Sequence, residues 1–417
     1  MTSGSSGISL ISPSGAQRQN QQEGAIMSRH QLYSSLILIS GAIFISACTS
    51  VAQAPQSSQQ ATTQPAPVQA APAAPAAPAA PAAAPQAGLP NVMILATGGT
   101  IAGSGATSTT TVGYTAATVG VDALIAAVPE LKKVANVRGE QVFQIASENM
   151  NNDYWLKLAK RVNTLLAQSD VDGIVITHGT DTIEETAYFL DLVVKSRKPV
   201  VVVGAMRPST ALSADGPLNL YNAVILAGSK EAVGKGVLVA MNDQINAARE
   251  VTKTNTFTTD TFKAPELGML GYIQGGKVFF YRLPTRRHTA DTEFDVSNLN
   301  ALPQVDIVYG YANMNPIGLN AFVANGAKGI VHAGVGDGSL ANAVKPALIE
   351  ARKKGVIIVR SSRVGQGIVA RNGEANDDQL DFVVSDTLNP QKARILLMLA
   401  LTRTNDTRAI QRMFYTY

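Results

Sequence analysis

The chain has 417 residues, of which 46% are hydrophobic and 15% charged, so it can bury a large core, and its length favours two domains. Lysine and arginine number 34 against 30 aspartates and glutamates, a net charge of +4. No cluster of basic residues and no row of aromatic residues accompanies this charge, which argues against a nucleic-acid partner. With Cys48 as the single cysteine, disulfides within the chain and metal sites built from cysteines are excluded.

Residues 1–48 are predicted to be a leader. Met27 offers a second start, and the apolar stretch 36–47 that follows it is about a dozen residues long, whereas a membrane-spanning helix needs about 20. Such a stretch is typical of an export signal. It ends in ISAC, which resembles a bacterial lipobox whose cysteine, here Cys48, is lipidated and becomes the mature N-terminus. The alternative is an ordinary signal peptide with an incidental cysteine; both predict export to the periplasm.

Residues 49–89 are dominated by Ala, Pro, Gln, Ser and Thr and include APAAPAAPAAP. The spacing of the prolines excludes a helix, and the weak hydrophobic drive excludes a core. Such segments favour extended polyproline II at about 3.1 Å per residue, which predicts a disordered stalk on the order of 100 Å long. We expect no catalysis in it.

From residue 90 onward, short β-rich runs alternate with helical patterns, which predicts an α/β fold with a mainly parallel sheet covered on both faces. We expect a larger N-terminal domain over 90–282, an interdomain linker over 283–303 and a smaller C-terminal α/β domain over 304–417. This smaller domain is predicted to end in an amphipathic helix, NPQKARILLMLALTR, with Pro390 near its start. The clearest predicted strands are 92–96, 173–177, 200–203, 236–240, 330–332 and 356–360.

The first predicted strand runs into a glycine turn, TGGT, that ends at Thr100. The two glycines allow positive φ and let a ligand approach the main chain. The hydroxyl of Thr100 then lies at the carboxyl end of a strand, where open α/β sheets bind their ligands. The flexible polar run 104–114 ends in Tyr114, and we expect a lid that brings this phenol toward Thr100.

A second polar turn, HGTDT, follows the predicted strand 173–177. The pattern T-x-x-E from Thr182 to Glu185 predicts a capping box that opens a helix. Thr180 and Asp181 would therefore lie at a helix N-terminus, beside free N–H donors and the positive end of the helix dipole. Such a position favours a substrate carboxylate or a developing oxyanion. The alternative is that Asp181 only caps the helix.

Lys253 is flanked by small polar residues rather than acids. A lysine desolvated at a sheet rim can act as a base, but the neighbouring residues alone favour a solvated lysine. The histidines of the body, His178, His288 and His332, lack the i, i+4 spacing of a zinc helix. We expect structural or supporting roles for them, and no metal.

With these motifs assembled, residues 89–417 resemble the bacterial type II L-asparaginases, more specifically the periplasmic glutaminase-asparaginases. The matching segments are ILATGGTIAG, ASEN, VITHGTDT, GAMRPSTALSADGPLNLYNAV, VTKTN, RSSRVGQG and LNPQKARIL. The resemblance implies the asparaginase fold and an amidohydrolase that cleaves the side-chain amide of L-glutamine or L-asparagine with no cofactor. It also implies a homotetramer in which a neighbouring subunit completes each site, and a membrane contact only through a lipid anchor.

The resemblance also implies roles for individual residues. Thr100 matches the nucleophile, and Tyr114 matches the lid tyrosine that helps to activate it. Thr180, Asp181 and Lys253 match a set that shuttles the proton and holds the substrate or the attacking water. The residues implied to bind substrate are Gly99, Ser147, Glu148, Gly179, Thr180, Asp181 and Ala205, together with Glu374 and Ser339 from a neighbouring subunit.

Three positions refine the resemblance. Glu148 and Ser339 stand where asparagine-selective members tend to carry Gln and Asn, which favours tolerance of the extra methylene of glutamine. Asp337 replaces an expected Asn, and its charge either shifts the pKa of nearby groups or is solvated.

Two rival functions fit parts of the chain. A lipid-anchored periplasmic amino-acid-binding protein would share the leader, the stalk and a carboxylate-binding cleft, but it would not require Thr100, Tyr114 and Lys253. A nucleotide-binding enzyme would share the glycine turn, but the chain has no G-x-x-x-x-G-K-[ST] segment, and TGGTIAG lacks the Rossmann glycine spacing.

Overall fold

The structure is a computed structural model that describes residues 86–417. The predicted leader, the lipobox at Cys48 and nearly all of the predicted stalk lie outside the described residues. Within 86–417, no helix combines the length and the apolarity that crossing a bilayer requires.

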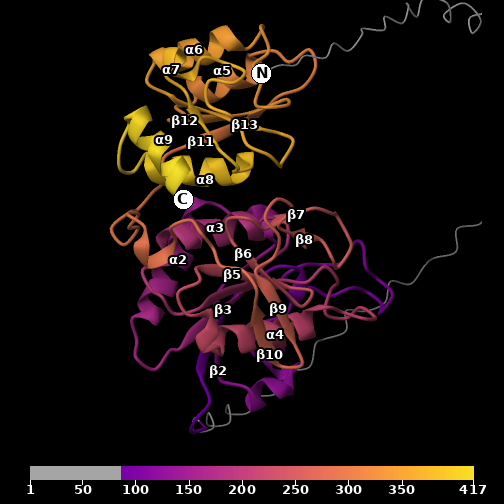
Figure 1. Cartoon of the computed structure of the whole chain (residues 1–417). Helices are drawn as coiled ribbons and strands as arrows, with labels where there is room; N and C mark the ends of the chain where they lie inside the picture. The colour runs from indigo at the N-terminus through magenta and orange to yellow at the C-terminus, as the bar shows by residue number, and fades with distance from the viewer. Residues whose placement is uncertain (1–85) are drawn as a thin grey trace, which may run out of the picture. The chain divides into compact units, whose positions relative to one another are not determined.

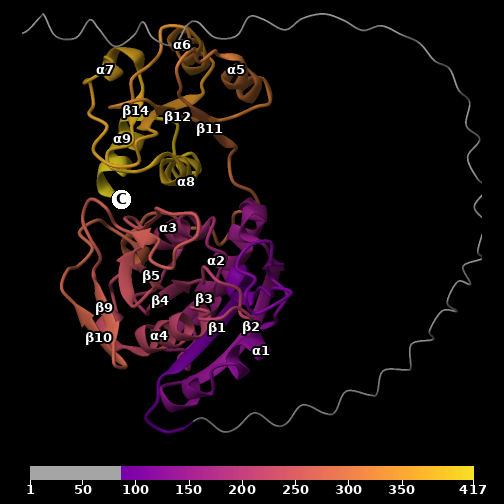
Figure 2. The same ribbon diagram turned by 90° about the vertical axis from the view of Figure 1, so that its right-hand side faces the viewer.

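An eight-stranded sheet organises the first part of the described chain, with the order β10-β9-β6-β5-β4-β3-β1-β2 (Figures 1 and 2). The strands β1 to β5 pair parallel with one another, whereas β6 pairs antiparallel with β5 and with β9, and β9 pairs antiparallel with β10. The strands are β1 (Asn91–Gly98), β2 (Asn136–Ile145), β3 (Gly173–Thr177), β4 (Val200–Val203), β5 (Val237–Met241), β6 (Gln244–Ala247), β9 (Gly271–Gln274) and β10 (Lys277–Phe280).

Helices cover both faces of this sheet, and Figure 2 shows α4 on one face and α3 on the other. The inner strands β3, β4 and β5 are buried over their whole length because both faces are covered. Helix α3 is itself buried on nearly all sides. The helices are α1 (Val121–Ala126), α2 (Asn152–Leu166), α3 (Ile183–Val193) and α4 (Gly216–Gly228), with short 3-10 turns η1 (Thr100–Ala102), η2 (Pro129–Lys133), η3 (Ser147–Asn149), η4 (Lys230–Ala232) and η5 (Thr289–Asp291).

A separate two-stranded ribbon, β7 (Thr252–Lys253) with β8 (Phe262–Lys263), leaves the main sheet after β6. Thr261 holds the loop between the two strands, because its hydroxyl donates to the carbonyl of Asn255 and accepts from the N–H of Asn255. This ribbon places Lys253 outside the large sheet.

A four-stranded parallel sheet, with the order β11-β12-β13-β14, organises the second part. One face contributes to a small core with α5 and α6, and the other face packs on α8. Helix α8 also packs against α3, so one continuous core includes both α3 and α8. The elements are β11 (Val305–Tyr309), α5 (Ile317–Ala324), β12 (Gly329–Gly334), α6 (Lys345–Lys353), β13 (Ile357–Ser362), α7 (Asp377–Leu380), β14 (Val383–Val384), α8 (Pro390–Ala400) and α9 (Thr407–Thr416).

Every strand predicted from the sequence is present to within two residues, and the mainly parallel α/β architecture is confirmed. The predicted end of the second part was wrong in two respects. A further helix, α9, follows α8. Helix α8 is also buried on nearly all sides rather than amphipathic, because it lies between α3 and the second sheet.

Candidate active site

The turns after β1 and β3 meet backbone to backbone at the carboxyl edge of the large sheet. Gly98 and Gly99 both have positive φ, 109° and 82°. A Cβ on Gly99 would lie 2.3 Å from the Cα and N atoms of Gly179, and a Cβ on Gly179 would lie 2.4 Å from the Ser147 Oγ atom. Only glycine fits at positions 99 and 179. The close approach of Gly99 to Gly179 brings Thr100, Ser147 and the turn after β3 together.

Thr100 opens η1 and pairs with the predicted lid residue. The Thr100 Oγ1 and Tyr114 Oη atoms are 2.8 Å apart, a hydrogen bond that either hydroxyl can donate. The segment predicted to be a lid is closed at its base by two backbone hydrogen bonds between Ser104 and Thr115. The Thr100 hydroxyl therefore faces another hydroxyl group and not the apolar core.

A second constellation forms where β3 meets the β7–β8 ribbon. The Lys253 Nζ atom donates to Thr180 Oγ1 at 3.0 Å and to Asp181 Oδ1 at 2.6 Å. The Lys253 side chain is 17% exposed and that of Asp181 is 60% exposed. The solvated lysine that the neighbouring residues favoured is therefore not found, because Thr180 and Asp181, distant in sequence, accept hydrogen bonds from this side chain. Asp181 does not serve only as a cap, since its carboxylate pairs with Lys253.

The capping box predicted at Thr182 is absent. The Thr182 hydroxyl makes no hydrogen bond to the first turn of α3 and donates to the carbonyl oxygen of Ser147 at 2.8 Å. The Ser147 Oγ atom accepts from the N–H of Asp181 at 3.2 Å. The two bonds tie η3 to the turn after β3, so Thr182 fixes Ser147 in place of capping a helix.

The buried His178 ring holds the turn after β3 in place through hydrogen bonds. Its Nδ1 atom is 2.8 Å from the carbonyl oxygen of Gly179, which can only accept, so Nδ1 carries the proton. Its Nε2 atom is 2.9 Å from Thr186 Oγ1, which also accepts from the indole N–H of Trp155. Burial lowers the pKa of His178 from 6.5 to about 4, so the ring is neutral and structural, as predicted.

A cavity of about 790 Å³ contains both constellations. The predicted residues that line it are Gly99, Thr100, Tyr114, Ser147, Glu148, Gly179, Thr180, Asp181 and Lys253. Ala205 is buried behind its neighbours Met206 and Arg207, which do line the cavity. Ser339 and Glu374 of the same chain do not line it, and Glu374 borders a different surface depression.

Sequence reasoning gave no role to some residues that line this cavity. Met206 and Arg207 are held there because the Asp215 carboxylate accepts from both of their backbone N–H groups at 2.9 Å. The polar GAMRPS segment after β4 was the available signal for them. The loop 256–259, which follows Lys253, also lines the cavity, and its composition carried no comparable signal.

The fold and the cavity together define an α/β enzyme whose site combines two hydroxyl groups, a phenol and a lysine–carboxylate pair at the carboxyl edge of a parallel sheet. The family profile described as asparaginase, N-terminal, matches residues 91–286, and the profile of the glutaminase/asparaginase C-terminal domain matches residues 304–414. The chain belongs to the asparaginase family.

Named relatives agree with this assignment. The glutaminase-asparaginase of Pseudomonas fluorescens biotype A is 58% identical over 330 residues, which cover 79% of this chain and 91% of that protein. A protein of Haemophilus influenzae named probable L-asparaginase periplasmic is 54% identical over 328 residues, 79% of this chain and 93% of its own. The crystal structure of a probable cytoplasmic L-asparaginase from Campylobacter jejuni superposes with a TM-score of 0.77 at 52% identity, covering 79% of this chain and 100% of that one.

Proposed function

We propose that this chain hydrolyses the side-chain amide of L-glutamine and L-asparagine to the acid and ammonia, with Thr100 as the nucleophile. The observation that carries the proposal is the 2.8 Å contact between the hydroxyl groups of Thr100 and Tyr114 in the cavity. A threonine hydroxyl is a weak nucleophile at neutral pH, so a second group must take its proton as it attacks. Membership of the asparaginase family supports the amide as the target.

In the first half of the reaction, the Thr100 oxygen attacks the amide carbon while Tyr114 relays the threonine proton. The negative charge that develops on the amide oxygen needs donors, and we assign this role to the backbone N–H groups near Thr100 and Thr180. The carbon–nitrogen bond then breaks, the nitrogen takes a proton and leaves as ammonia, and the substrate acyl group remains on Thr100 as an ester.

In the second half, water attacks the ester carbon and restores the Thr100 hydroxyl. The Lys253 ammonium donates to Thr180 Oγ1, so the hydroxyl proton of Thr180 is free to point into the cavity. We assign to Thr180, Asp181 and Lys253 the holding of this water and the transfer of its proton. The positive charge of Lys253 favours the anionic forms that occur along this path.

Substrate recognition follows from charge. Glu148 and Asp181 put carboxylates on the cavity wall, which suits the α-ammonium group of an amino acid, and the buried Ser147 hydroxyl lies beside them. The backbone carbonyl of Ala205 is assigned to the amide end. Glu148 and Ser339 in place of Gln and Asn favour acceptance of glutamine as well as asparagine.

We also propose a homotetramer in which Glu374 and Ser339 of a neighbouring subunit close the cavity. In a single chain the space of about 790 Å³ is larger than one amino acid fills, and neither residue lines it. For location we propose the periplasm, with lipidation of Cys48 as the anchor. The name of the H. influenzae relative supports the periplasm, and the leader supports the anchor.

The test is ammonia release by the purified chain from both amides. We expect Thr100→Ala to reduce kcat by about three orders of magnitude or more, with an unchanged melting temperature. Thr256→Ala is the matched control, because Thr256 lines the same cavity and is exposed. Turnover by Thr100→Ala close to that of the wild type would reject Thr100 as the nucleophile. Tight binding of the amino acid without ammonia release would favour the binding-protein alternative.

A further inference from the structure

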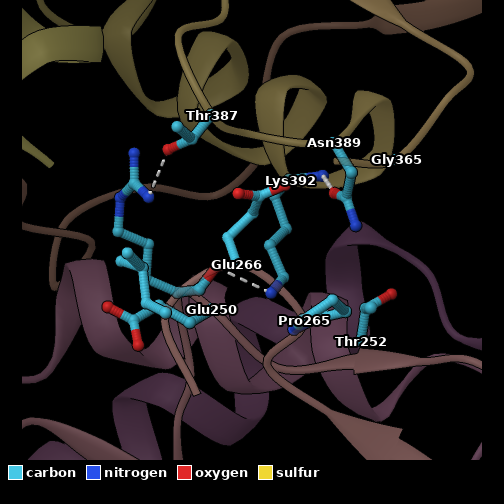
Figure 3. Close-up of a pocket in the computed structure, with 10 residues that line it drawn as sticks. Glu250, Thr252, Pro265, Glu266, Gly365, Thr387, Asn389 and Lys392 are labelled. Carbon is cyan, nitrogen blue, oxygen red and sulfur yellow. Dashed lines mark hydrogen bonds between the residues drawn. The ribbon is translucent and has the colours of Figure 1, made fainter. Parts of the chain in front are cut away.

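Helix α8 carries a buried lysine, Lys392, on the wall of a small pocket of about 50 Å³. Lys392, labelled in Figure 3, is 2% exposed. Its Nζ atom donates to the carbonyl oxygen of Arg249 at 2.8 Å and to that of Val251 at 2.5 Å. Asn389 caps the helix by accepting from the backbone N–H of Lys392 at 3.0 Å. The lysine thus reaches from a fixed helix end to the main chain of another segment.

That segment leads directly to the site. Val251 lies two residues before Lys253, and Lys253 Nζ contacts Thr180 and Asp181 at 3.0 and 2.6 Å. Thr252 and Lys253 form strand β7, and a strand of two residues is too short to fix its own position. A displacement of the main chain at residues 249–251 would therefore move the Lys253 ammonium.

The residue before Lys392 reaches the other half of the same constellation. The Gln391 Nε2 atom donates to Glu184 Oε1 at 3.0 Å. Glu184 is buried in the first turn of α3, three residues after Asp181. Two consecutive side chains of α8, Gln391 and Lys392, which we call the α8 clamp, thus hold both segments whose side chains meet at Lys253.

Burial of this ammonium group needs a reason beyond packing. Burial lowers the pKa of Lys392 from 10.5 to about 8, although the nearby carboxylates of Glu184, Glu250 and Asp191 act in the opposite direction and Arg249 adds to the lowering. A buried charge costs free energy unless it is paired or hydrogen-bonded. An ammonium group carries three donors, so Lys392 can bond the main-chain carbonyls of Arg249 and Val251 at the same time.

We propose that the α8 clamp positions Lys253 for the reaction: Lys392 fixes the backbone of residues 249–251, and Gln391 fixes the start of α3. The ammonium of Lys253 is thereby held at hydrogen-bonding distance from Thr180 and Asp181. This inference rests on the proposed function, because it supposes that Lys253 acts in amide hydrolysis. Gln391 and Lys392 are positioning residues and touch no substrate.

The experiment compares Lys392→Met and Lys392→Gln with the wild type in the full chain. Methionine keeps the length and loses the donors, so we expect kcat to fall about 10- to 100-fold with KM within about twofold. Glutamine keeps a donor and should recover part of the loss. Hydrogen exchange of backbone amides in peptides covering 249–254 should rise in Lys392→Met, and this readout does not depend on activity.

Lys195→Met is the matched control. The Lys195 Nζ atom also donates two hydrogen bonds, to the carbonyl and the hydroxyl of Thr292 at 2.8 and 2.9 Å, and none of its partners lies in the cavity. We expect it to keep kcat and the exchange at 249–254, whatever it does to the melting temperature. If Lys392→Met does not fold, Gln391→Leu is the second variant, for which the same fall in kcat is expected.

The α8 clamp would be refuted if Lys392→Met had the kcat and the hydrogen exchange of the wild type. It would also be refuted if Lys195→Met showed the same fall in kcat at the same loss of stability. An unaltered kcat in Gln391→Leu would remove Gln391 from it. A wild-type chain that releases no ammonia would refute the proposed function instead. The exchange data would still show whether Lys392 holds residues 249–251.

Discussion

The ion pair between Arg360 and Asp377 gives a sharp test of how the loops that carry Ser339 and Glu374 are held. Both side chains have 0% exposure, and two parallel bonds of 2.6 and 2.7 Å join the guanidinium to the carboxylate. Arg360 also donates to the carbonyl oxygens of Asp337, Gly338 and Ala370 at 2.9 to 3.1 Å. The buried guanidinium thus fixes both the loop after β12 that contains Ser339 and the loop after β13 that contains Glu374.

The perturbation is Asp377→Ala, which leaves the guanidinium buried without its counter-charge. Removing one partner of a buried pair costs about 3 to 5 kcal/mol, against a total stability of about 5 to 15 kcal/mol for a typical domain. The N–H of Asn372, which donates to Asp377 Oδ2 at 2.8 Å, also loses its acceptor. We expect the free energy of unfolding to fall by an amount in this range.

The neighbouring aspartate provides the control. Asp378 bonds Arg371 and Asn372, but its side chain is 66% exposed, so Asp378→Ala should change stability little. The assay is urea unfolding of both variants at one protein concentration, because subunit association would make the midpoint depend on concentration. Equal, small losses in the two variants would refute the assignment of Arg360 and Asp377 as the hub of these loops.

Two further predictions concern single residues. Burial and Arg360 lower the pKa of His332 from 6.5 to about 4, so below pH 6.5 this side chain binds a proton in the unfolded chain that it does not bind in the folded chain, and its contribution to stability falls with the pH. His332→Leu should remove only this contribution, about 2 to 3 kcal/mol at pH 4.5, while His178, whose pKa is also lowered to about 4, keeps its own. Urea unfolding at pH 8 and 4.5 would contradict the argument if both proteins changed alike. Glu148→Gln should raise kcat/KM for asparagine relative to glutamine by about 10-fold, measured as ammonia release from each, and an unchanged ratio would remove Glu148 from selectivity.

The parallel strands β1, β3, β4, β5, β12 and β13 could be predicted because their apolar runs are buried and are bounded by polar turns. The parallel strands β2, β11 and β14 were not among the predicted strands, since β2 and β11 are partly exposed and β14 has two residues. The antiparallel strands β6, β9 and β10 were missed, although their turns carry signals. Asn242 and Asp243 join β5 to β6 with φ of 52° and 62°, and Gly275 and Gly276 join β9 to β10 with φ of 58° and 74°. Residues at positive φ in two-residue loops are typical of tight hairpins. Attention to these turn residues would have added the antiparallel strands to the predicted sheet.

The site was only partly accessible from spacing. The turns at Thr100 and Thr180 could be recognised as polar residues that follow buried strands. Lys253 is 73 residues from Thr180, and no local pattern predicts that its side chain is half-buried beside Thr180. Its role came from family resemblance alone. At Thr182 a local pattern gave a wrong prediction. Its sequence fits a capping box, but in the folded chain its hydroxyl donates to the carbonyl oxygen of Ser147, which is distant in sequence.

Lys392 shows what the burial of a polar residue adds to such an interpretation. In NPQKARILLMLALTR, Lys392 looks like the polar face of a surface helix, and only the packing of α8 on α3 and on the second sheet removes that face from water. Once it is removed, each polar group must find a partner, and the partners found are carbonyls beside Lys253 and a carboxylate beside Asp181. A polar side chain in a helix without a solvent face is therefore a marker for the segment that it holds. In this chain the marked segments are those that meet at the proposed site.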